Sequence, residues 1–254
     1  MEADLQPHRS RYWLNAKAKA EDPRAFAAQV ETFCTAYADA PLLEALGCHV
    51  VSTDEMTGIQ ALERAAPTKP LRPGTPELRE HEYIRHGTLS LIANFNVATG
   101  QILAPSLGPT RTEADFAAHI AQTIATDPDA SWLFLADNLN THQSEALVRL
   151  VTDRCGLADD LGVKGHAGIL RSQASRAAFL GDPDHRIRFL YTPRHTSWLN
   201  QIELWFSILA RRVLKRGDFV SLAALEQRLR DFIAYYNQTA HPFKWTYRGR
   251  PLCR

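Results

Sequence analysis

The chain has 254 residues, of which 45% are hydrophobic and 22% charged, a composition typical of one large globular domain with a smaller appendage. Its first 15 residues are polar, which excludes a secretory signal. No apolar run approaches the roughly 20 residues that span a bilayer, so we expect a soluble cytoplasmic protein without membrane contact. The four cysteines are scattered and form no CxxC pair, which argues against a zinc cluster or a disulfide framework.

Charge is distributed unevenly along the chain. The net charge is +1, but residues 164–254 hold 16 Lys and Arg against 6 Asp and Glu, whereas residues 1–163 hold 13 against 22. A basic C-terminal third is typical of a surface that follows a phosphate backbone. A solvated helix face explains the same composition equally well, so both interpretations stay open at this point.

The N-terminal quarter contains an arm, a helix and a short strand. Residues 1–20 are polar and predict an arm or linker. Apolar residues at helical spacing predict a helix over 25–46. Residues 49–54 form a β-rich run that stops at Asp54, and the four prolines within 59–81 predict an extended loop.

The middle of the chain predicts two strands, a helix and a buried strand. The strands are expected over 83–96 and 101–104, with Gly100 supplying the positive φ of a tight turn between them. Thr112 is a candidate N-cap for a helix over 111–125. The continuous apolar run that ends at Asp137 predicts a strand with both faces buried.

The remaining sequence alternates between helix and strand. Helices are expected over 143–155, 198–216 and 222–236, a strand over 187–191, and a Gly-rich, basic loop up to Pro183. This order predicts an α/β fold in which helices cover a mixed β-sheet.

Two of the predicted strands end in an aspartate, Asp54 and Asp137. Sites in α/β sheets form at the carboxyl ends of strands, and an unpaired carboxylate beside an apolar strand is costly to desolvate. One such aspartate is usually a cap or turn residue. Two of them on neighbouring strands would repel each other, and a divalent cation removes that repulsion, so the pair favours a metal site.

A third acid, Glu203, stands among large apolar residues near the start of a predicted helix. Asn200 precedes it by three positions and is therefore expected on the same helix face, where it would orient Glu203 or a ligated water. The alternative is an N-terminal Glu that interacts favourably with the helix dipole. The two aspartates make the metal-site interpretation the stronger one.

Three sequence blocks resemble those of DDE transposases, in particular the bacterial insertion-sequence group related to mariner elements. They are Ser52-Thr53-Asp54-Glu55, Leu135-Ala136-Asp137-Asn138-Leu139-Asn140-Thr141-His142 and Thr192-Pro193-Arg194-His195-Thr196-Ser197-Trp198-Leu199-Asn200-Gln201-Ile202-Glu203. The tail, with Tyr235-Tyr236-Asn237 and Pro242-Phe243-Lys244-Trp245, is also similar to that group. The resemblance implies a ribonuclease H-like catalytic domain over 47–254, preceded over 1–46 by an arm and a linker helix.

The resemblance also implies a mechanism. Asp54, Asp137 and Glu203 would be the acidic triad that holds two Mg²⁺ or Mn²⁺ ions, since carboxylate oxygens suit hard cations better than zinc. One ion would activate water or a 3′-hydroxyl and the other would stabilise the leaving oxygen. The expected chemistry is cleavage of double-stranded DNA at transposon ends followed by strand transfer into target DNA, by a bacterial cytoplasmic protein that acts as a homodimer.

Residues around the triad are candidates for secondary roles. The candidate DNA contacts are Arg194, His195, Asn200, Arg211, Arg212, Lys215 and Arg216, and the candidate supporting residues are Asn138, Asn140 and His142. For both histidines a structural role is at least as plausible as phosphate contact or proton transfer. Trp198, Trp205 and Phe206 are expected in the core.

The sequence departs from the family pattern in three places. Glu203 follows Asp137 by 66 positions, longer than in eukaryotic mariner members, and the extra length predicts an inserted loop over 156–183. Met56 stands where a lysine is expected. The chain begins at a point that resembles the last part of the region ahead of the catalytic domain, so the helix-turn-helix modules that read the element's ends are expected to be missing.

Two other functions compete with an active transposase. A truncated regulator would dimerise with full-length transposase or occupy DNA without cutting it. The missing recognition module favours this role, whereas the presence of all three acids favours the enzyme. A ribonuclease H-like nuclease of repair or of RNA–DNA hybrids would use the same chemistry, and the block that ends at Glu203 argues against it through the resemblance.

Overall fold

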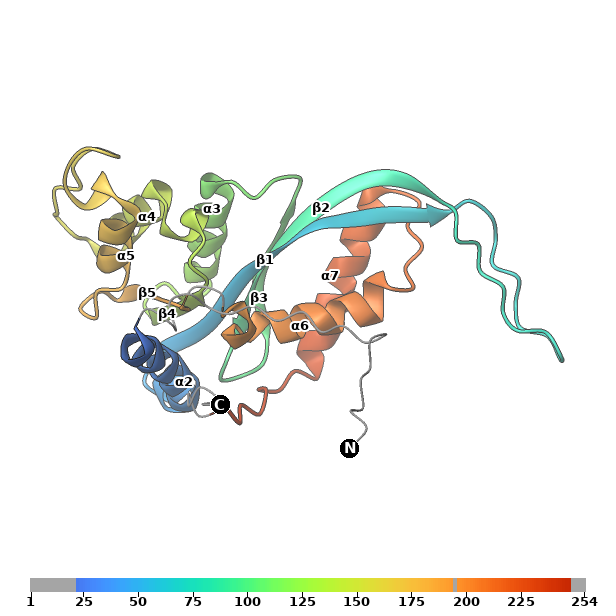
Figure 1. The fold of residues 1–254 in the computed structure, drawn as a ribbon, viewed down its shortest axis with the longest axis horizontal. Helices are drawn as coiled ribbons and strands as arrows, with labels where there is room; N and C mark the ends of the chain where they lie inside the picture. Colours follow the sequence, from blue (N-terminus) through green and yellow to red (C-terminus); the bar gives the residue numbers. More distant parts are fainter. Residues whose placement is uncertain (1–21, 194–195, 248–254) are drawn as a thin grey trace, which may run out of the picture.

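The computed structural model describes residues 22–193 and 196–247, which are built around a five-stranded mixed sheet (Figure 1). The strands are β1 (Cys48–Arg64), β2 (Tyr83–Asn96), β3 (Ile102–Gly108), β4 (Ser131–Ala136) and β5 (Ile187–Tyr191), in the order β3-β2-β1-β4-β5. The first three form antiparallel pairs, and β4 and β5 add parallel to β1. The predicted α/β fold with a mixed, helix-flanked sheet is confirmed.

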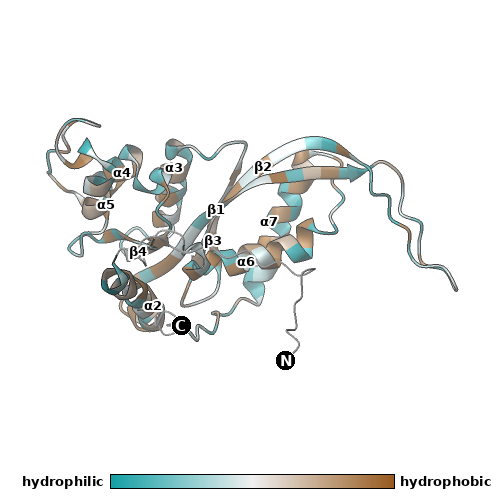
Figure 2. Ribbon diagram, in the orientation of Figure 1, coloured by the Kyte–Doolittle hydropathy of each residue, from teal (hydrophilic) through white to brown (hydrophobic). Residues whose placement is uncertain are grey.

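Six α-helices in the described residues cover the sheet in two layers. They are α2 (Pro23–Ala45), α3 (Glu113–Ile124), α4 (Glu145–Cys155), α5 (Gln173–Leu180), α6 (Ile202–Leu209) and α7 (Leu222–Gln238). One core contains α2, α6 and α7, and the other contains α3, α4 and α5. The helices mix hydrophilic and hydrophobic residues (Figure 2), and each has buried and exposed positions, as amphipathic helices do. No helix of the described part is long and apolar enough to cross a membrane.

The central strand β4 explains why there are two cores. Side chains alternate between the faces of a strand. Leu133 and Leu135 therefore enter the core beneath α2 and α6, while Trp132 and Phe134 enter the core beneath α3 and α4. The apolar run predicted as a strand buried on both faces is confirmed.

Strand β1 continues ten residues beyond Asp54, where the sequence predicted its end. Gly58 adopts a φ of +65°, and the pairing with β2 shifts register between Met56 and Ile59, so a bulge lets the strand continue to Arg64. The loop predicted over 59–81 was therefore wrong at its start. Strands β1 and β2 form a long hairpin that passes over α7, and residues 65–82 at its outer end reach beyond the helices (Figure 1).

Strand β3 also exceeds its predicted length. It lies at the edge of the sheet, where the Pro105 backbone is not needed to donate to a second neighbour. The preceding turn at Gly100 has the expected positive φ, +78°.

The inserted stretch predicted as a loop contains the helix α5, so that prediction was wrong. Ser172 caps α5 by accepting the Ser175 N–H, and Leu170 and Leu180 are buried. Arg176 on α5 is buried, and its Nη1 donates to Leu170 O at 3.3 Å. The insertion is thus part of the second core.

The helix predicted over 198–216 is divided into three pieces. A 3-10 turn, Ser197–Leu199, precedes α6, and a π-helical turn, Ala210–Leu214, follows it. The break at Asn200 places Glu203 in the first turn of α6. The helices predicted over 25–46, 111–125, 143–155 and 222–236 are confirmed within two residues at each end.

Candidate active site

The register of the parallel strands places Asp54 beside Asp137. Ser52 on β1 pairs with Leu135 on β4, and each aspartate lies two residues beyond these partners. Asp54 thus stands within the long strand β1, at the point where its pairing with β4 ends. The side-by-side placement of the two acids, predicted from strand ends, is produced by this register.

Asp54 is a buried carboxylate with an 8% exposed residue surface. Its Oδ1 accepts the Glu55 N–H at 2.8 Å, and its Oδ2 accepts a hydrogen bond from Asn200 Nδ2 at 3.3 Å. Burial and the negative charge of Asp137 raise the pKa of Asp54 to about 7. A neighbouring cation would favour the charged form.

Asp137 directly follows β4, and its carboxylate oxygen Oδ1 is already engaged in two contacts. Its Oδ1 accepts the Leu139 N–H at 2.9 Å and lies 2.7 Å from His142 Nδ1. Burial alone would raise the pKa of Asp137, but His142 and the Leu139 N–H lower it below its ordinary value. Asp137 is therefore an anion whose Oδ2 is left for another partner.

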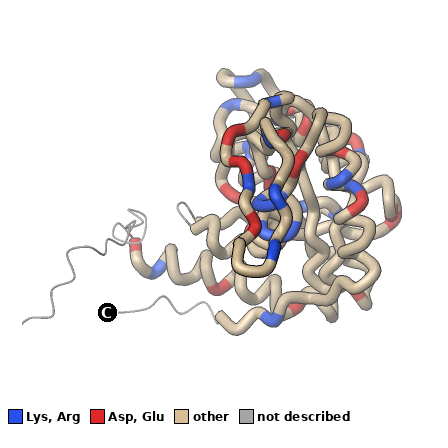
Figure 3. Tube along the Cα trace, turned by 90° about the vertical axis from the view of Figure 1, so that its right-hand side faces the viewer, with Lys and Arg blue, Asp and Glu red and all other residues tan. Residues whose placement is uncertain are grey.

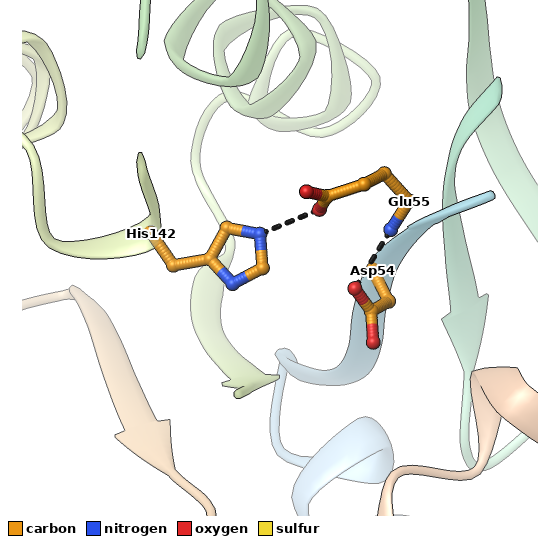
Figure 4. Close-up of side chains that lie close together, drawn as sticks. All are labelled: Asp54, Glu55 and His142. Carbon is orange, nitrogen blue, oxygen red and sulfur yellow. Dashed lines mark hydrogen bonds and ion pairs between the residues drawn. The ribbon is translucent and has the colours of Figure 1, made fainter. Parts of the chain in front are cut away.

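His142 lies between two carboxylates, that of Glu55 (Figure 4) and that of Asp137. Its Nε2 lies 2.8 Å from Glu55 Oε2, while its Nδ1 faces Asp137, and the side chain is fully buried. Both nitrogens lie within 3 Å of carboxylate oxygens, an arrangement that favours the imidazolium form. Burial opposes this charge, but the two carboxylates raise the pKa of His142 to about 10. Arg111 Nη1 also donates to Glu55, at 2.7 Å.

Glu203 lies in the first turn of α6 and is exposed. Partial burial of its carboxyl group and the charge of Asp137 raise its pKa above the ordinary value. The charge of Asp137 thus acts on both Asp54 and Glu203.

Buried hydrogen bonds fix the segment that carries Glu203. Ser52 Oγ accepts the Ile202 N–H at 2.9 Å and donates to Asn200 Oδ1, while Asn200 Nδ2 donates to Thr53 O at 3.0 Å. Asn200 therefore contacts Asp54 and its strand, where the sequence predicted contact with Glu203. The break before α6 turns Asn200 toward β1.

Helix α2 holds the same segment from the other side. The Tyr37 hydroxyl donates to Leu199 O at 2.7 Å and accepts the Gln201 N–H at 3.1 Å. Trp245 of the C-terminal segment packs on the Tyr37 ring with centroids 4.9 Å apart. The start of α6 is thus held between β1 and α2.

A cavity of about 430 Å³ opens beside Asp137. It lies between the segments that follow β4 and β5, and its lining residues are Asp137, Asn138, Leu139, Thr192, Pro193, Thr196 and Ser197. Solvent and a substrate group can therefore reach this acid.

The residues fit a hard divalent cation. Burial and the charge of Asp137 raise the pKa values of Asp54 and Glu203, and a divalent cation would relieve both effects. The tightest group of ligand atoms in the described residues, within 4.8 Å of one another, is however that of Asp54, Glu55 and His142. His142 and Glu55 already neutralise each other, so we assign them to positioning Asp137.

The other predicted residues have mainly supporting contacts. Asn138 Oδ1 accepts a hydrogen bond from Gln143 Nε2 at 2.9 Å, and Asn140 Oδ1 accepts one from Arg176 Nη2 at 3.3 Å, so both brace the segment after β4.

Arg211, Arg212, Lys215 and Arg216 are exposed beyond the far end of α6. Arg194 and His195 lie outside the described residues. Trp205 and Phe206 are in the core, as predicted, but Trp198 is 54% exposed.

Sequence reasoning missed the residues that position the acids: Tyr37, Ser52, Glu55 and Arg111. An adjacent carboxylate at Glu55 was the one local signal. In the sequence, Tyr37 cannot be distinguished from an ordinary core residue of an amphipathic helix, because its hydrogen-bond partners are 162 and 164 positions away.

A family model described as DDE superfamily endonuclease matches residues 49–226 of the chain. Two similar structures are the Mos1 transposase paired-end complex with the left transposon end and the catalytic domain of Mos1 mariner transposase. The first has a TM-score of 0.51 and 14% identity, over 91% of this chain and 60% of that chain. The second has a TM-score of 0.50 and 10% identity, over 89% and 85%. No curated protein matches.

The similarity to the Mos1 catalytic domain concerns the fold and confirms its predicted ribonuclease H-like class. The chain spans about 60% of the transposase chain in the paired-end complex. The family match covers β1 through the start of α7, and therefore Asp54, Asp137 and Glu203, but it leaves out α2.

Proposed function

We propose, since this chain belongs to the DDE superfamily of endonucleases, that it is a transposase catalytic domain that cuts DNA and transfers the cut strand to a second DNA site. The observation that carries the proposal is the family match over residues 49–226, which contain Asp54, Asp137 and Glu203, together with the strand register that sets Asp54 beside Asp137. Carboxylates kept close together against their own repulsion are what a two-metal phosphodiester reaction requires.

Asp54, Asp137 and Glu203 would hold two Mg²⁺ or Mn²⁺ ions. When bound, these ions supply activation of the attacking oxygen and stabilisation of the leaving oxygen. The donor set consists of carboxylate oxygens, which suits these cations.

The chain itself positions the acids. His142 and the Leu139 N–H hold Asp137 Oδ1, which leaves Oδ2 directed to other partners. Asn200 donates to Asp54 and keeps the start of α6 against β1. A scissile phosphate would approach through the cavity beside Asp137. Fixed ligands reduce the reorganisation required in the transition state.

Double-stranded DNA, as transposon ends and as target, is the proposed substrate. Arg211, Arg212, Lys215 and Arg216 supply positive charge beyond α6 for backbone contacts, and Arg194 and His195 are proposed as further contacts. Asn200, predicted from the sequence as a DNA contact, is instead fully buried with its amide bonded to β1, so it acts as a positioning residue. One similar structure is a paired-end complex with a transposon end, which supports DNA as the substrate. A homodimer is the proposed working form.

Nicking of supercoiled DNA by the purified chain with Mg²⁺ or Mn²⁺ tests the proposal. We expect nicked product from the native chain and a loss of at least about 100-fold in Asp137→Asn and Glu203→Gln, which preserve shape but remove charge. The matched control is Asp129→Asn, an exposed acid away from the site. Binding without cutting, even with Mn²⁺, would instead favour a non-catalytic regulator, and equal cutting by all variants would refute the acid assignments.

A further inference from the structure

Three arginines from two helical segments surround one hollow of about 410 Å³. Arg212 and Arg216 come from the π-helical turn after α6 and its continuation, and Arg228 comes from α7. The sequence analysis selected the first two among four basic neighbours and did not select Arg228. Arg211 and Lys215 do not line the hollow.

The walls of the hollow are fixed by backbone contacts to β1. The Phe219 N–H donates to Leu62 O at 2.8 Å, and Asp218 Oδ1 accepts the Arg64 N–H at 2.8 Å. Phe219 is buried beneath the turn at Gly217, where a Cβ would lie 2.2 Å from the Phe219 ring. The arginines therefore project from a rigid base.

The three arginines make no ion pair within the described residues, although the pKa of Glu77, which is lowered by its pair with Arg79, is lowered further by the charge of Arg216. Asp218 is the one carboxylate in the lining, against three guanidinium groups. No carboxylate in residues 22–193 and 196–247 lies within ion-pair distance of these three groups, whereas Arg230 on the same helix pairs with Glu226 at 2.7 Å. Figure 3 views the molecule from this end and shows Lys and Arg segments near the centre of the view, with Asp and Glu segments beside them.

We propose that Arg212, Arg216 and Arg228 together bind a single phosphate of the DNA backbone. Guanidinium groups donate in a planar fork that matches phosphate oxygens, so three of them can satisfy one phosphate. The inference rests on the proposed function in taking DNA as the ligand.

Distance separates this site from the acids. Arg216 follows Glu203 by 13 positions in a nearly continuous helix, which corresponds to about 20 Å. A phosphate in the hollow is therefore too far from the acids to react. It would act as an anchor that holds the duplex along α6 while another phosphate reaches Asp137.

The salt dependence of DNA binding tests how many phosphates the three arginines neutralise. Each neutralised phosphate contributes about 0.9 to the slope of log Kobs against log salt concentration. Polarisation of a labelled duplex, measured without divalent metal so that cutting is prevented, gives this slope for the native chain. The variants are Arg212→Gln, Arg216→Gln, Arg228→Gln and the triple variant.

We expect each single variant to weaken binding and the triple variant to reduce the slope by about 0.9, the value for one phosphate. Between 50 and 200 mM salt, the native chain would then lose about 3.5-fold more affinity than the triple variant. The control Arg230→Gln removes the same charge from the opposite side of α7 and should leave the slope unchanged. Thermal unfolding of each variant checks the fold, which these exposed side chains should not affect.

Other slopes would overturn the assignment. A decrease of about 2.7 in the triple variant would mean three separate phosphates, and no decrease, or no DNA binding by the native chain, would mean that the hollow holds no backbone phosphate. The nicking assay reports separately on the proposed function. If the triple variant reduces the slope by the value for one phosphate but the native chain never cuts DNA, the phosphate site is supported and the nuclease proposal is refuted. If the native chain cuts DNA but the triple variant leaves the slope unchanged, only the phosphate site is refuted.

Discussion

His142 is a buried cation between Glu55 and Asp137, and its charge has a defined effect on stability. Its pKa rises from 6.5 in the unfolded chain to about 10 in the folded chain. The ion pairs therefore contribute fully below pH 6.5, and their contribution is lost as the pH rises through about 10. We expect metal-free His142→Gln to be less stable than the native chain by about 3 kcal/mol at pH 6, because the buried Glu55 and the half-buried Asp137 carboxylates lose their partner.

Urea unfolding at pH 6, 8 and 10 measures this difference, which should shrink toward the highest pH. The control His166→Gln removes an exposed histidine on the inserted segment and should change stability by no more than about 0.5 kcal/mol at any pH. A difference that stays constant across the range would show that His142 is neutral and that its role is packing.

Among the elements, α2 lies outside the family match but contacts the segment that carries Glu203. Tyr37→Phe keeps the ring and removes both hydrogen bonds to this segment. We expect a loss of stability of about 1–3 kcal/mol, since Leu199 O and the Gln201 N–H stay buried without their partner. We also expect nicking to fall about 10- to 100-fold, with a higher Mn²⁺ concentration needed for half-maximal rate, because the acid is misplaced.

Phe33→Leu separates positioning from stability. Phe33 packs edge-on against Tyr37, is fully buried, and makes no polar contact with the Glu203 segment. Its replacement should lower stability similarly while leaving the Mn²⁺ requirement unchanged. If Tyr37→Phe and Phe33→Leu shift the Mn²⁺ requirement equally, α2 acts through stability alone.

The turn between β2 and β3 is held tightly against the C-terminal segment. Gly100 has a φ of +78°, and a Cβ there would lie 2.1 Å from His241 O. We expect Gly100→Ala to destabilise the chain by at least about 2 kcal/mol more than Gly74→Ala. Gly74 has nearly the same φ, +76°, but no atom within 4 Å, so it measures the backbone strain by itself. Equal losses in thermal or urea unfolding would show that the C-terminal segment does not pack there in solution.

Local signals predicted some elements well. Thr112 and Asp115 form a capping box that begins α3. The continuous apolar run of β4 is typical of a strand with both faces buried, so the strand was predictable without its neighbours. The extension of β1 was missed because a glycine bulge is recognisable only when β2 is paired beside it. Helix α5 was missed because its short sequence is stabilised by tertiary contacts of Leu170, Arg176 and Leu180.

At the scale of the whole molecule, the acids make stability depend on pH and on divalent metal together. Burial and Asp137 raise the pKa of Asp54 from 3.8 to about 7. Its contribution to stability is full below pH 3.8 and lost as the pH rises through 7, where the buried charge forms. We therefore expect Mn²⁺ to raise the unfolding temperature more at pH 8 than at pH 6, because at pH 6 the metal must displace a proton.

Asp54→Asn should abolish the pH dependence of this Mn²⁺ effect, and Asp129→Asn should preserve it. Scanning calorimetry with and without Mn²⁺ provides the measurement. A larger Mn²⁺ effect at pH 6 than at pH 8 would contradict the raised pKa of Asp54.

Local sequence signals predicted the three acids of the site, whereas the contacts that position them join residues far apart in the sequence. Asp54, Asp137 and Glu203 were predicted because each stands beside an apolar run that makes a carboxylate conspicuous. The pairing of His142 with Glu55 joins positions 87 apart, and the tie between Ser52 and Ile202 joins positions 150 apart. No periodicity or spacing in the sequence specifies such contacts.

Because the residues in these contacts are far apart in the sequence, the ribosome synthesises them many seconds apart. At about 5–20 residues per second, the start of α6 leaves the ribosome roughly 8 to 30 s after Ser52. The hairpin of β1 and β2 is local and can pair early, whereas the parallel strands and α6 join it across long chain segments. A growing chain therefore carries most of its sheet before it carries the third acid, and the acidic cluster becomes complete only late in synthesis.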